Sequence, residues 1–413
     1  MPLVTLHEAV ERAREVLPPG PVEWLPTEAC LGRVLARDLA APFALPRASQ
    51  SLMDGYAVRS EDTRDAASPD GLSLILTGPP SAAGHPAEAP LSAGTCRRIL
   101  TGAPLPPGAD AVVPQEEVRL DGDRIVVGRP VPKGQWVTVP GEEIAAGERT
   151  LHAGDLLTPA RLSLAVALGC AVLPVVRRCR VAVLGTGDEL CELGEPLGAQ
   201  SRYADSRYLI AALVRQAGAQ PIHLGRVADD AGRIAHALQE ANAELVISTG
   251  GAGQGDKDFL VRAWARLGLR PLFTEIALRP GHGTACAAAS TTLYFALPGG
   301  PLAAEIVFHE LIVPVLQKWS QGSEGAPPRL SAQLLAPVKN KSPLWRAVTG
   351  TASFRDNSLW FQPFDKRQGR HFSRRRQKNA YALIPPKSPI LKRGQRVTLG
   401  FFLGHLPLVQ EAP

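Results

Sequence analysis

The feature that most constrains the fold is a region between residues 181 and 319 in which short apolar runs alternate with helical patterns. The runs at 181–185, 221–225 and 244–248 are each followed by a helix-like segment. Such alternation is typical of a parallel sheet with helices on both faces. The pattern therefore predicts a doubly wound α/β domain, with bounds at residues 176–322.

The regions on either side follow other patterns. Residues 5–17 predict a helix, because a threonine and a glutamate three residues apart can form a capping box ahead of an apolar face. Residues 41–136 contain short apolar runs between Gly and Pro clusters, which is typical of a small β module. Helical patterns return at 137–175, and a second β module is predicted after the linker at Pro327 and Pro328.

Length and composition limit the class of protein. A chain of 413 residues exceeds the size at which one core usually keeps growing, which predicts about two to four domains. No apolar stretch reaches the roughly 20 residues of a membrane span, and the first residues lack the basic-then-apolar order of a signal peptide. The six cysteines form no CxxC pair, which favours reduced thiols. We therefore expect a cytoplasmic protein with no membrane association.

Positive charge is confined to one segment. The net charge is +6, but residues 366–378 alone hold seven Lys or Arg and no acid, so the remainder carries −1. Phe372 is the only phenylalanine, tyrosine or tryptophan in this segment, whereas proteins that bind single-stranded nucleic acids stack several aromatic rings on the bases. The pattern argues against nucleic acid as a partner.

A glycine-rich turn follows the predicted strand at 244–248, at the sheet edge where open α/β sheets bind ligands. It runs from 249 to 258, contains Gly250, Gly251 and Gly253, and leads into a helix. Its backbone amides could bind an anion, although a plain reversal of the chain is the alternative.

An acidic turn follows the predicted strand at 181–185. Gly187 would let the backbone approach a ligand, and the carboxylates of Asp188 and Glu189 could hold a hard cation such as Mg²⁺. A solvated turn explains the same residues equally well.

Further turn motifs complete the set. Those at 279–282 and 297–301 follow other strands of the same region, and two more, at 51–57 and 101–104, lie in the N-terminal half. The Asp-Gly of the 51–57 motif could also mark only the bend of a hairpin.

Taken together, these motifs resemble the molybdopterin molybdenumtransferases, a family that includes the E domain of gephyrin. The similarity covers nearly the whole chain, and the combination of MDGYA, TGAP and TGDEL is specific because three unrelated short motifs rarely coincide in order. The matching segments, in the family's order, are residues 51–59, 98–117, 141–147, 183–190, 248–259, 279–281 and 297–301.

The resemblance implies a multidomain α/β plus β architecture in four parts. These are an elongated N-terminal domain from residues 1–40 and 137–175, an inserted β domain at 41–136, the molybdopterin-binding α/β domain at 176–322, and a C-terminal β barrel at 327–413.

The resemblance also implies an activity. This is transfer of molybdate into adenylylated molybdopterin with release of AMP, assisted by Mg²⁺, in a homodimer whose pockets combine two subunits. A molybdopterin adenylyltransferase is an expected partner. The alternative is a diverged, non-catalytic paralogue that binds molybdopterin or its adenylate as a carrier or assembly partner.

Roles follow for the residues of these motifs. The implied metal ligands are Glu189 and Asp258. The implied catalytic residues are Asp54, Thr101, Glu143, Glu189, Asp229, Asp258 and Arg279. The implied substrate-binding residues are Gly187, Asp188, Gly250, Gly251, Gly253, His282, Pro298, Gly299, Pro301 and Ser373. Each could instead be an ordinary turn or cap residue.

The chain departs from the family pattern at several of these turns. His282 stands in place of a lysine, Gly300 and Arg207 stand in place of asparagines, and Glu275 replaces a lysine found in some members. Glu275 would weaken anion binding if it faces the pocket, and would have little effect if it faces solvent. The basic run at 370–378 could restore the lost positive charge or form a solvated loop.

Overall fold

The computed structural model of the chain describes residues 3–250, 259–321, 329–364 and 377–402. It forms two compact units. Unit 1 comprises Met1–Ala36, Gly154–Thr158 and Val172–Pro413, and unit 2 comprises Arg37–Ala153 and Pro159–Ala171. Among the described residues, no helix has both the length and the apolar character needed to cross a membrane.

The α/β part of unit 1 is built on a six-stranded sheet with the order β16-β13-β17-β21-β20-β18. The strands are β13 (Arg180–Thr186), β16 (Gln220–Val227), β17 (Leu245–Thr249), β18 (Arg270–Phe273), β20 (Ala285–Ala289) and β21 (Thr292–Leu297). β16, β13, β17 and β21 are parallel; at one edge β20 pairs antiparallel with β21, and β18 pairs antiparallel with β20. The carboxyl ends of the four parallel strands therefore meet at one edge of the sheet.

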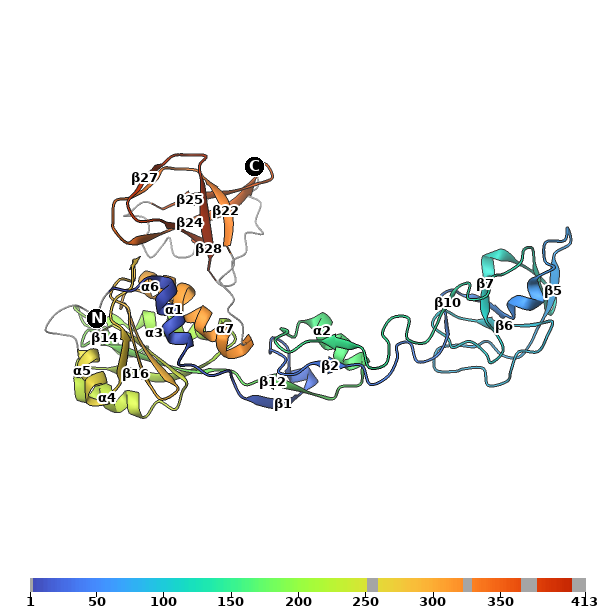
Figure 1. The fold of residues 1–413 in the computed structure, drawn as a ribbon, viewed down its shortest axis with the longest axis horizontal. Helices are drawn as coiled ribbons and strands as arrows, with labels where there is room; N and C mark the ends of the chain where they lie inside the picture. Colours follow the sequence, from blue (N-terminus) through green and yellow to red (C-terminus); the bar gives the residue numbers. More distant parts are fainter. Residues whose placement is uncertain (1–2, 251–258, 322–328, 365–376, 403–413) are drawn as a thin grey trace. The chain divides into compact units, whose positions relative to one another are not determined.

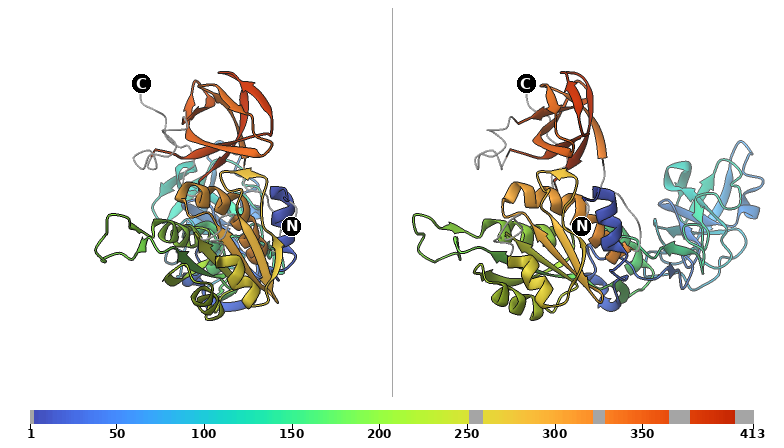
Figure 2. Two further views of the ribbon diagram at one scale, coloured as in Figure 1. Left: turned by 90° about the vertical axis from the view of Figure 1, so that its left-hand side faces the viewer. Right: turned by 60° about the vertical axis from the view of Figure 1, so that its left-hand side comes forward.

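Helices cover both faces of this sheet (Figures 1 and 2). They are α1 (Leu6–Arg14), α3 (Asp205–Gln216), α4 (Ala231–Gln239), α5 (Phe259–Arg266), α6 (Pro301–Val307) and α7 (Val313–Gln321). α1 begins with the expected capping box: the hydroxyl of Thr5 accepts from the Glu8 N–H, and the Glu8 carboxylate accepts from the Thr5 N–H.

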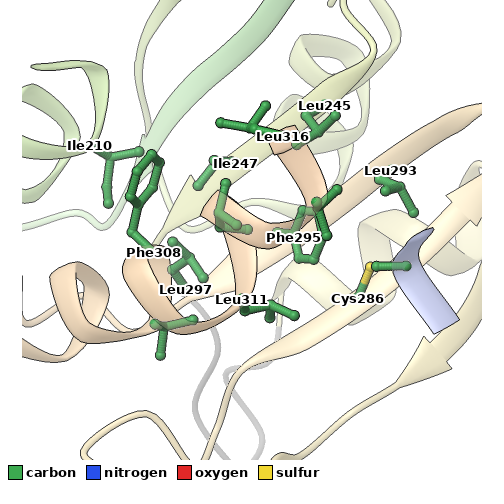
Figure 3. Packing of buried hydrophobic residues seen from close by; sticks show 14 of the residues in the cluster. Ile210, Leu245, Ile247, Cys286, Leu293, Phe295, Leu297, Phe308, Leu311 and Leu316 are labelled. Atoms are coloured by element: carbon green, nitrogen blue, oxygen red, sulfur yellow. The ribbon is translucent and has the colours of Figure 1, made fainter. Parts of the chain in front are cut away.

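Alternate side chains of the central strands enter two separate cores. Val181 and Val183 pack with α1, α3 and α7, whereas Ala182 and Leu184 pack with α4 and α5. Figure 3 shows part of the first core, in which Phe308 lies next to Leu297. Burying one such side chain contributes about 1.5–3 kcal/mol. The three layers confirm the predicted α/β fold.

Two helices have features that the sequence pattern does not reveal. The predicted helix at residues 5–17 packs into the α/β core through Ala9, Val10 and Ala13, because its apolar stripe is buried against the sheet layer. The last helix is not continuous. A π-helical segment, Phe308–Ile312, separates α6 from α7, and an apolar stripe in the sequence does not reveal the wider turn.

The C-terminal part of unit 1 is a closed five-stranded barrel, as predicted. Its strands are β22 (Arg329–Leu334), β24 (Trp345–Arg355), β25 (Ser358–Pro363), β26 (Ala380–Ile384) and β28 (Arg396–Phe401). The barrel is closed because each strand pairs with two others: β24 with β25 and β26, β28 with β26 and β22, and β22 with β25. A ribbon of β23 (Val338–Asn340) and β27 (Ser388–Leu391) flanks the barrel. β19 (Leu278–Arg279) of the α/β part extends its sheet beside β24.

Three short elements complete unit 1. An antiparallel ribbon joins β1 (Val22–Pro26) to β12 (Val172–Val176). A 3₁₀ turn covers Thr27–Ala29. Beyond β13, β14 (Leu190–Cys191) and β15 (Arg202–Tyr203) form a two-stranded parallel pair.

Unit 2 contains a six-stranded sheet with the order β7-β4-β6-β5-β9-β8, two short ribbons, one α-helix and two 3₁₀ turns. The sheet strands are β4 (Gly55–Val58), β5 (Leu72–Leu76), β6 (Thr95–Ile99), β7 (Ala111–Pro114), β8 (Val118–Asp121) and β9 (Arg124–Val127). The ribbons pair β2 (Leu39–Ala40) with β11 (Arg149–Leu151) and β3 (Gln50–Ser51) with β10 (Val137–Thr138). The helices are α2 (Pro159–Ala167) and the 3₁₀ turns Ser60–Thr63 and Gln115–Glu117. The sheet core includes Tyr56, Leu74 and Ile125, so this unit is mostly β structure.

Candidate active site

The turn after β13 is joined to the loop after β16. The Gly187 N–H donates to the Val227 carbonyl at 3.2 Å, and the Asp229 N–H donates to Oδ1 of Asp188 at 3.0 Å. Glu189 is exposed, and no described residue makes a hydrogen bond or ion pair with its carboxylate. The turn is therefore fixed in place while Glu189 stays available to a ligand.

Two glycines let the ends of β13, β17 and β21 approach each other. Gly250 has a φ of +99°, and a Cβ added to it would lie 2.3 Å from the carbonyl oxygen of Thr186. A Cβ on Gly299 would lie 3.3 Å from the Gly250 Cα, and the Ser206 hydroxyl donates to the Gly299 carbonyl at 2.7 Å. Any side chain at Gly250 would push the Thr186 backbone away, so glycine is required there.

A cavity of about 800 Å³ lies between the α/β part of unit 1 and the barrel. Among the described residues that line it, none is acidic. The basic side chains in its walls are those of Arg279, His282, Lys339, Lys341 and Arg346. Such a lining favours an anionic ligand.

Arg279 and Arg346 are direct neighbours in this cavity. They are paired residues of the parallel ladder between β19 and β24, in which adjacent strands lie about 4.8 Å apart. Like charges on neighbouring residues repel, and an anion bound between them would relieve the repulsion. Nη1 of Arg346 also donates to the Lys339 carbonyl at 2.6 Å, which fixes its direction.

Asn340 holds the segment that presents the two lysines. It is buried, and its Nδ2 donates to the carbonyls of Leu344, Ile384 and Pro385 at 2.8–3.1 Å. Its Oδ1 accepts from the Ser342 N–H at 3.0 Å. The sequence alone does not single out Lys339, Lys341 and Arg346 as site residues, because a few basic residues beside a short strand resemble a solvated face.

Glu275 contacts His282 and is not among the residues that line the cavity. Its carboxylate lies 3.6 Å from Nε2 of His282, while Nδ1 of this histidine lies 3.0 Å from the Ile276 carbonyl. Since a carbonyl only accepts, Nδ1 carries the proton in this contact. Glu275 therefore acts on the cavity through His282.

A buried polar cluster fixes the barrel to the last helix. Glu310 accepts from Arg329 at 2.6 Å and from the hydroxyl of Tyr381, and Lys378 pairs with Glu305. Next to them, burial lowers the pKa of His309 to about 4, and the positive charges of Lys378 and Arg329 add to the effect. These contacts set the position of the cavity wall.

In unit 2, the structure brings together Asp54 and Thr101, two residues that the sequence could not place in one pocket. Oδ1 of Asp54 accepts from the hydroxyl of Thr101 at 2.7 Å and from its N–H at 2.8 Å. These two hydrogen bonds lower the pKa of Asp54. Glu143 is exposed, and its N–H donates to the Leu45 carbonyl at 3.1 Å.

Comparison with known proteins points to one family. Residues 4–169 match the model of the MoeA N-terminal region (domain I and II), and residues 182–318 match that of a probable molybdopterin binding domain. A molybdopterin molybdenumtransferase of Nostoc is 32% identical over 382 residues, which cover 89% of this chain and 85% of that protein. The chain belongs to the molybdopterin molybdenumtransferase family.

Other members of this family extend the similarity. The molybdopterin molybdenumtransferase of Bacillus subtilis is 30% identical over 388 residues, which cover 92% of this chain and 90% of that protein. The crystal structure of a molybdopterin biosynthesis MoeA protein from Pyrococcus horikoshii matches with a TM-score of 0.84 and 27% identity, covering 98% of this chain and all of that one.

Two departures from the molybdopterin molybdenumtransferase pattern lie away from the cavity lining. Arg207 is buried at the start of α3, where it pairs with Glu192 and lies 4.4 Å from the Tyr208 ring. Gly300 is exposed with open space around it, while Pro298 is half-buried and Pro301 is buried at the start of α6.

Part of the expected site lies outside the described residues. This concerns Gly251, Gly253, Asp258, Ser373 and most of the basic run at 370–378. Among the described residues, no three His, Cys, Asp or Glu side chains come close enough to hold a metal ion. Pairing of Glu189 with Asp258 around a metal stays a prediction.

Proposed function

We propose that this protein is a molybdopterin molybdenumtransferase that inserts molybdate into adenylylated molybdopterin and releases AMP. The observation that carries the proposal is the cavity whose described lining contains five basic residues and no carboxylate. Both substrates are anions, since molybdate is a dianion and the adenylate contains a pyrophosphate. Positive walls can hold two such anions close together despite their mutual repulsion.

Arg279 and Arg346 are the residues best suited to bind the oxyanion. Each guanidinium presents N–H donors in a planar fork that matches two oxygens of a tetrahedral anion. Lys339 and Lys341 add charge from a segment that Asn340 keeps rigid. Binding the anion in a preorganised cationic wall would lower the cost of charge that develops during transfer.

We further propose that Mg²⁺ serves as cofactor. The carboxylate of Glu189 fits a hard cation, because it is exposed and has no partner among the described residues. Oδ1 of Asp188 is already engaged by Asp229, and Asp258 is the expected second ligand. When bound, Mg²⁺ would polarise the phosphoryl group that is attacked.

A homodimer is also part of the proposal, with Asp54 and Thr101 of one subunit completing the site of the other. The β1–β12 ribbon supports a subunit interface, because Val22, Trp24 and Val172 are 43%, 57% and 51% exposed. Light scattering of the purified protein would test this point.

A molybdopterin adenylyltransferase in the cytoplasm is the proposed supplier of substrate.

The proposed activity can be tested by metal insertion in vitro. Purified protein is supplied with adenylylated molybdopterin, molybdate and Mg²⁺, while AMP release and activation of a cofactor-free molybdoenzyme are followed. Wild-type protein is expected to give both, and Glu189→Ala is expected to give neither. Glu240→Ala, an exposed glutamate at the end of α4, is the matched control and should retain activity.

A different outcome would support the non-catalytic alternative. Tight binding of the adenylate without AMP release by wild-type protein would identify a carrier or assembly partner. Equal activity of wild-type and Glu189→Ala protein would instead remove Glu189 from the metal site and leave the transferase proposal standing.

A further inference from the structure

A second group of basic side chains lies at the opposite edge of the α/β sheet, where the parallel strands begin. Arg180 and Gln220 are the first residues of β13 and β16, whereas the candidate active site lies beyond their last residues. The length of a strand of seven residues, roughly 20 Å, separates the two edges. An open depression of about 500 Å³ at this edge is lined by Glu23, Arg33, Arg177, Arg178, Arg180 and Gln220.

The arginines of this depression are only partly neutralised. Arg33 pairs with Glu23. Arg177 and Arg180 both donate to Glu244, at 2.9 and 2.8 Å. Arg178 is exposed, and within the described part of the chain no acidic side chain pairs with it. Four arginines and two glutamates leave a net charge of +2, so the depression attracts negatively charged groups.

An apolar groove continues from this depression. A second hollow of about 370 Å³ shares Arg33, Arg177 and Arg178 with the first. Its apolar walls come from Val34, Leu156, Val313, Leu316 and Trp319. Leu156 is 44% exposed, so solvent reaches this wall.

Trp319, in the wall of the second hollow, is held in place by Arg177, which lines both hollows. Its Nε1 donates to the Arg177 carbonyl at 2.7 Å, and the Arg177 guanidinium lies 5.4 Å from its ring centre. On its other side, a Cβ added to Gly20 would lie 2.5 Å from this Nε1. The groove is therefore preformed, which lowers the entropy cost of binding a ligand.

We propose that this groove binds a peptide segment of a partner protein in which carboxylates alternate with apolar side chains. The carboxylates would meet Arg178 and the outward N–H groups of Arg177, and the apolar side chains would meet Leu156 and Trp319. A single phosphate fits less well, because it would fill only the arginine half and would face Glu23 and Glu244. Continuity of the two hollows favours an extended chain.

The test uses a short fluorescein-labelled peptide of alternating Glu and Leu, with binding to the purified protein followed by fluorescence anisotropy. We expect saturable binding that weakens as salt rises. Arg178→Glu should weaken it about tenfold or more, because a repulsion replaces an attraction. Leu156→Ser should weaken it by a smaller factor. Arg393→Glu, at an exposed barrel cation without a partner in the described residues, is the matched control and should have no effect.

Four results would overturn the proposal. Equal weakening by Arg178→Glu and Arg393→Glu would mean that only overall charge matters. Loss of binding in Arg346→Ala would place the peptide in the active-site cavity. Full displacement of the peptide by an equal concentration of inorganic phosphate would make the depression a small-anion site. A peptide with Gln in place of Glu should bind weakly, and undiminished binding would also count against the proposal.

Discussion

The candidate active site combines two regions that differ in what they contribute. The edge of the α/β sheet contributes closely packed backbone, as at Gly250, where a side chain would strike the Thr186 carbonyl. The barrel side contributes the charged side chains of Lys339, Lys341 and Arg346. Substitutions in the first region should therefore cause steric clashes and a nearly complete loss of activity. Substitutions in the second region should lower anion affinity in proportion to the charge that is removed.

The largest effect is expected at the sheet edge. Gly250→Ala places a side chain 2.3 Å from the Thr186 oxygen at a φ of +99°, so the turn must move. A displacement of this kind can cost roughly 100-fold in rate. We expect at least that loss in AMP release, together with a lower Tm.

Gly300→Ala is the matched control, because its φ is −81° and its added Cβ meets nothing within 4 Å. It should retain activity and Tm. Similar losses in both variants would contradict the contrast between tightly packed and open glycines in this region.

The second largest effect is expected at the contact between the last helix and the barrel. Burial lowers the pKa of His309 from 6.5 to about 4, so below pH 6.5 the unfolded chain takes up a proton that the folded chain does not. Stability should therefore fall as pH drops from 6.5 to 4, by about 3 kcal/mol at about 1.4 kcal/mol per pKa unit.

Denaturant unfolding of wild-type and His309→Gln protein across this pH range would measure the effect. The difference in slope between the two isolates the histidine from carboxylates that titrate nearby, including Glu305 and Glu310. Parallel pH profiles would show that His309 is protonated in the folded protein, and would remove it as an acid-sensitive contact between helix and barrel.

A smaller, graded effect is expected in the barrel wall. Arg346→Ala removes a charged hydrogen-bond donor worth about 1.5–3 kcal/mol, so molybdate and AMP should bind roughly 10- to 100-fold more weakly in calorimetry. Arg346→Lys keeps the charge without the planar fork and should recover only part of the loss. Arg393→Ala serves as the control on the same barrel. Wild-type affinity in Arg346→Ala would exclude this wall from anion binding.

The contrast also explains which parts of the fold could be predicted. The α/β layers could be predicted because successive side chains of a strand, such as Val181 and Ala182, enter two different cores. The apolar runs that result are visible in the sequence. The π-helical segment at Phe308–Ile312 leaves no such mark, because one wider turn keeps the apolar stripe intact. The place of α1 depends on which surface buries its apolar face, and this is a tertiary property.

The same reasoning applies to the site. Gly250 and Gly299 could be recognised as candidate site residues from the sequence. A strained or crowded backbone accepts only glycine, and glycine-rich turns are easy to find in a sequence. Arg346 could not be recognised in this way. Its role depends on its pairing with Arg279 in the ladder that joins the α/β part to the barrel, and the sequence does not show that pairing. Asp54 and Thr101 are 47 residues apart, and only the folded β sheet brings the hydroxyl to the carboxylate.

The smallest effect tests how far charge beside the cavity matters. Glu275 lies 3.6 Å from Nε2 of His282, and its negative charge reduces the attraction that this imidazole, when protonated, offers to an anion. Both side chains are partly exposed, and such pairs contribute up to about 1 kcal/mol, so Glu275→Gln should strengthen molybdate binding by about two- to fivefold at low salt.

This gain should vanish when His282 is also replaced, because Glu275 is not itself a lining residue and can act on the anion only through that imidazole. Calorimetry on Glu275→Gln, His282→Ala and the double variant completes the cycle. A gain that persists in the double variant would mean that the carboxylate acts directly on the bound anion. Charged residues outside the cavity lining, such as Glu275, would then also contribute directly to anion affinity.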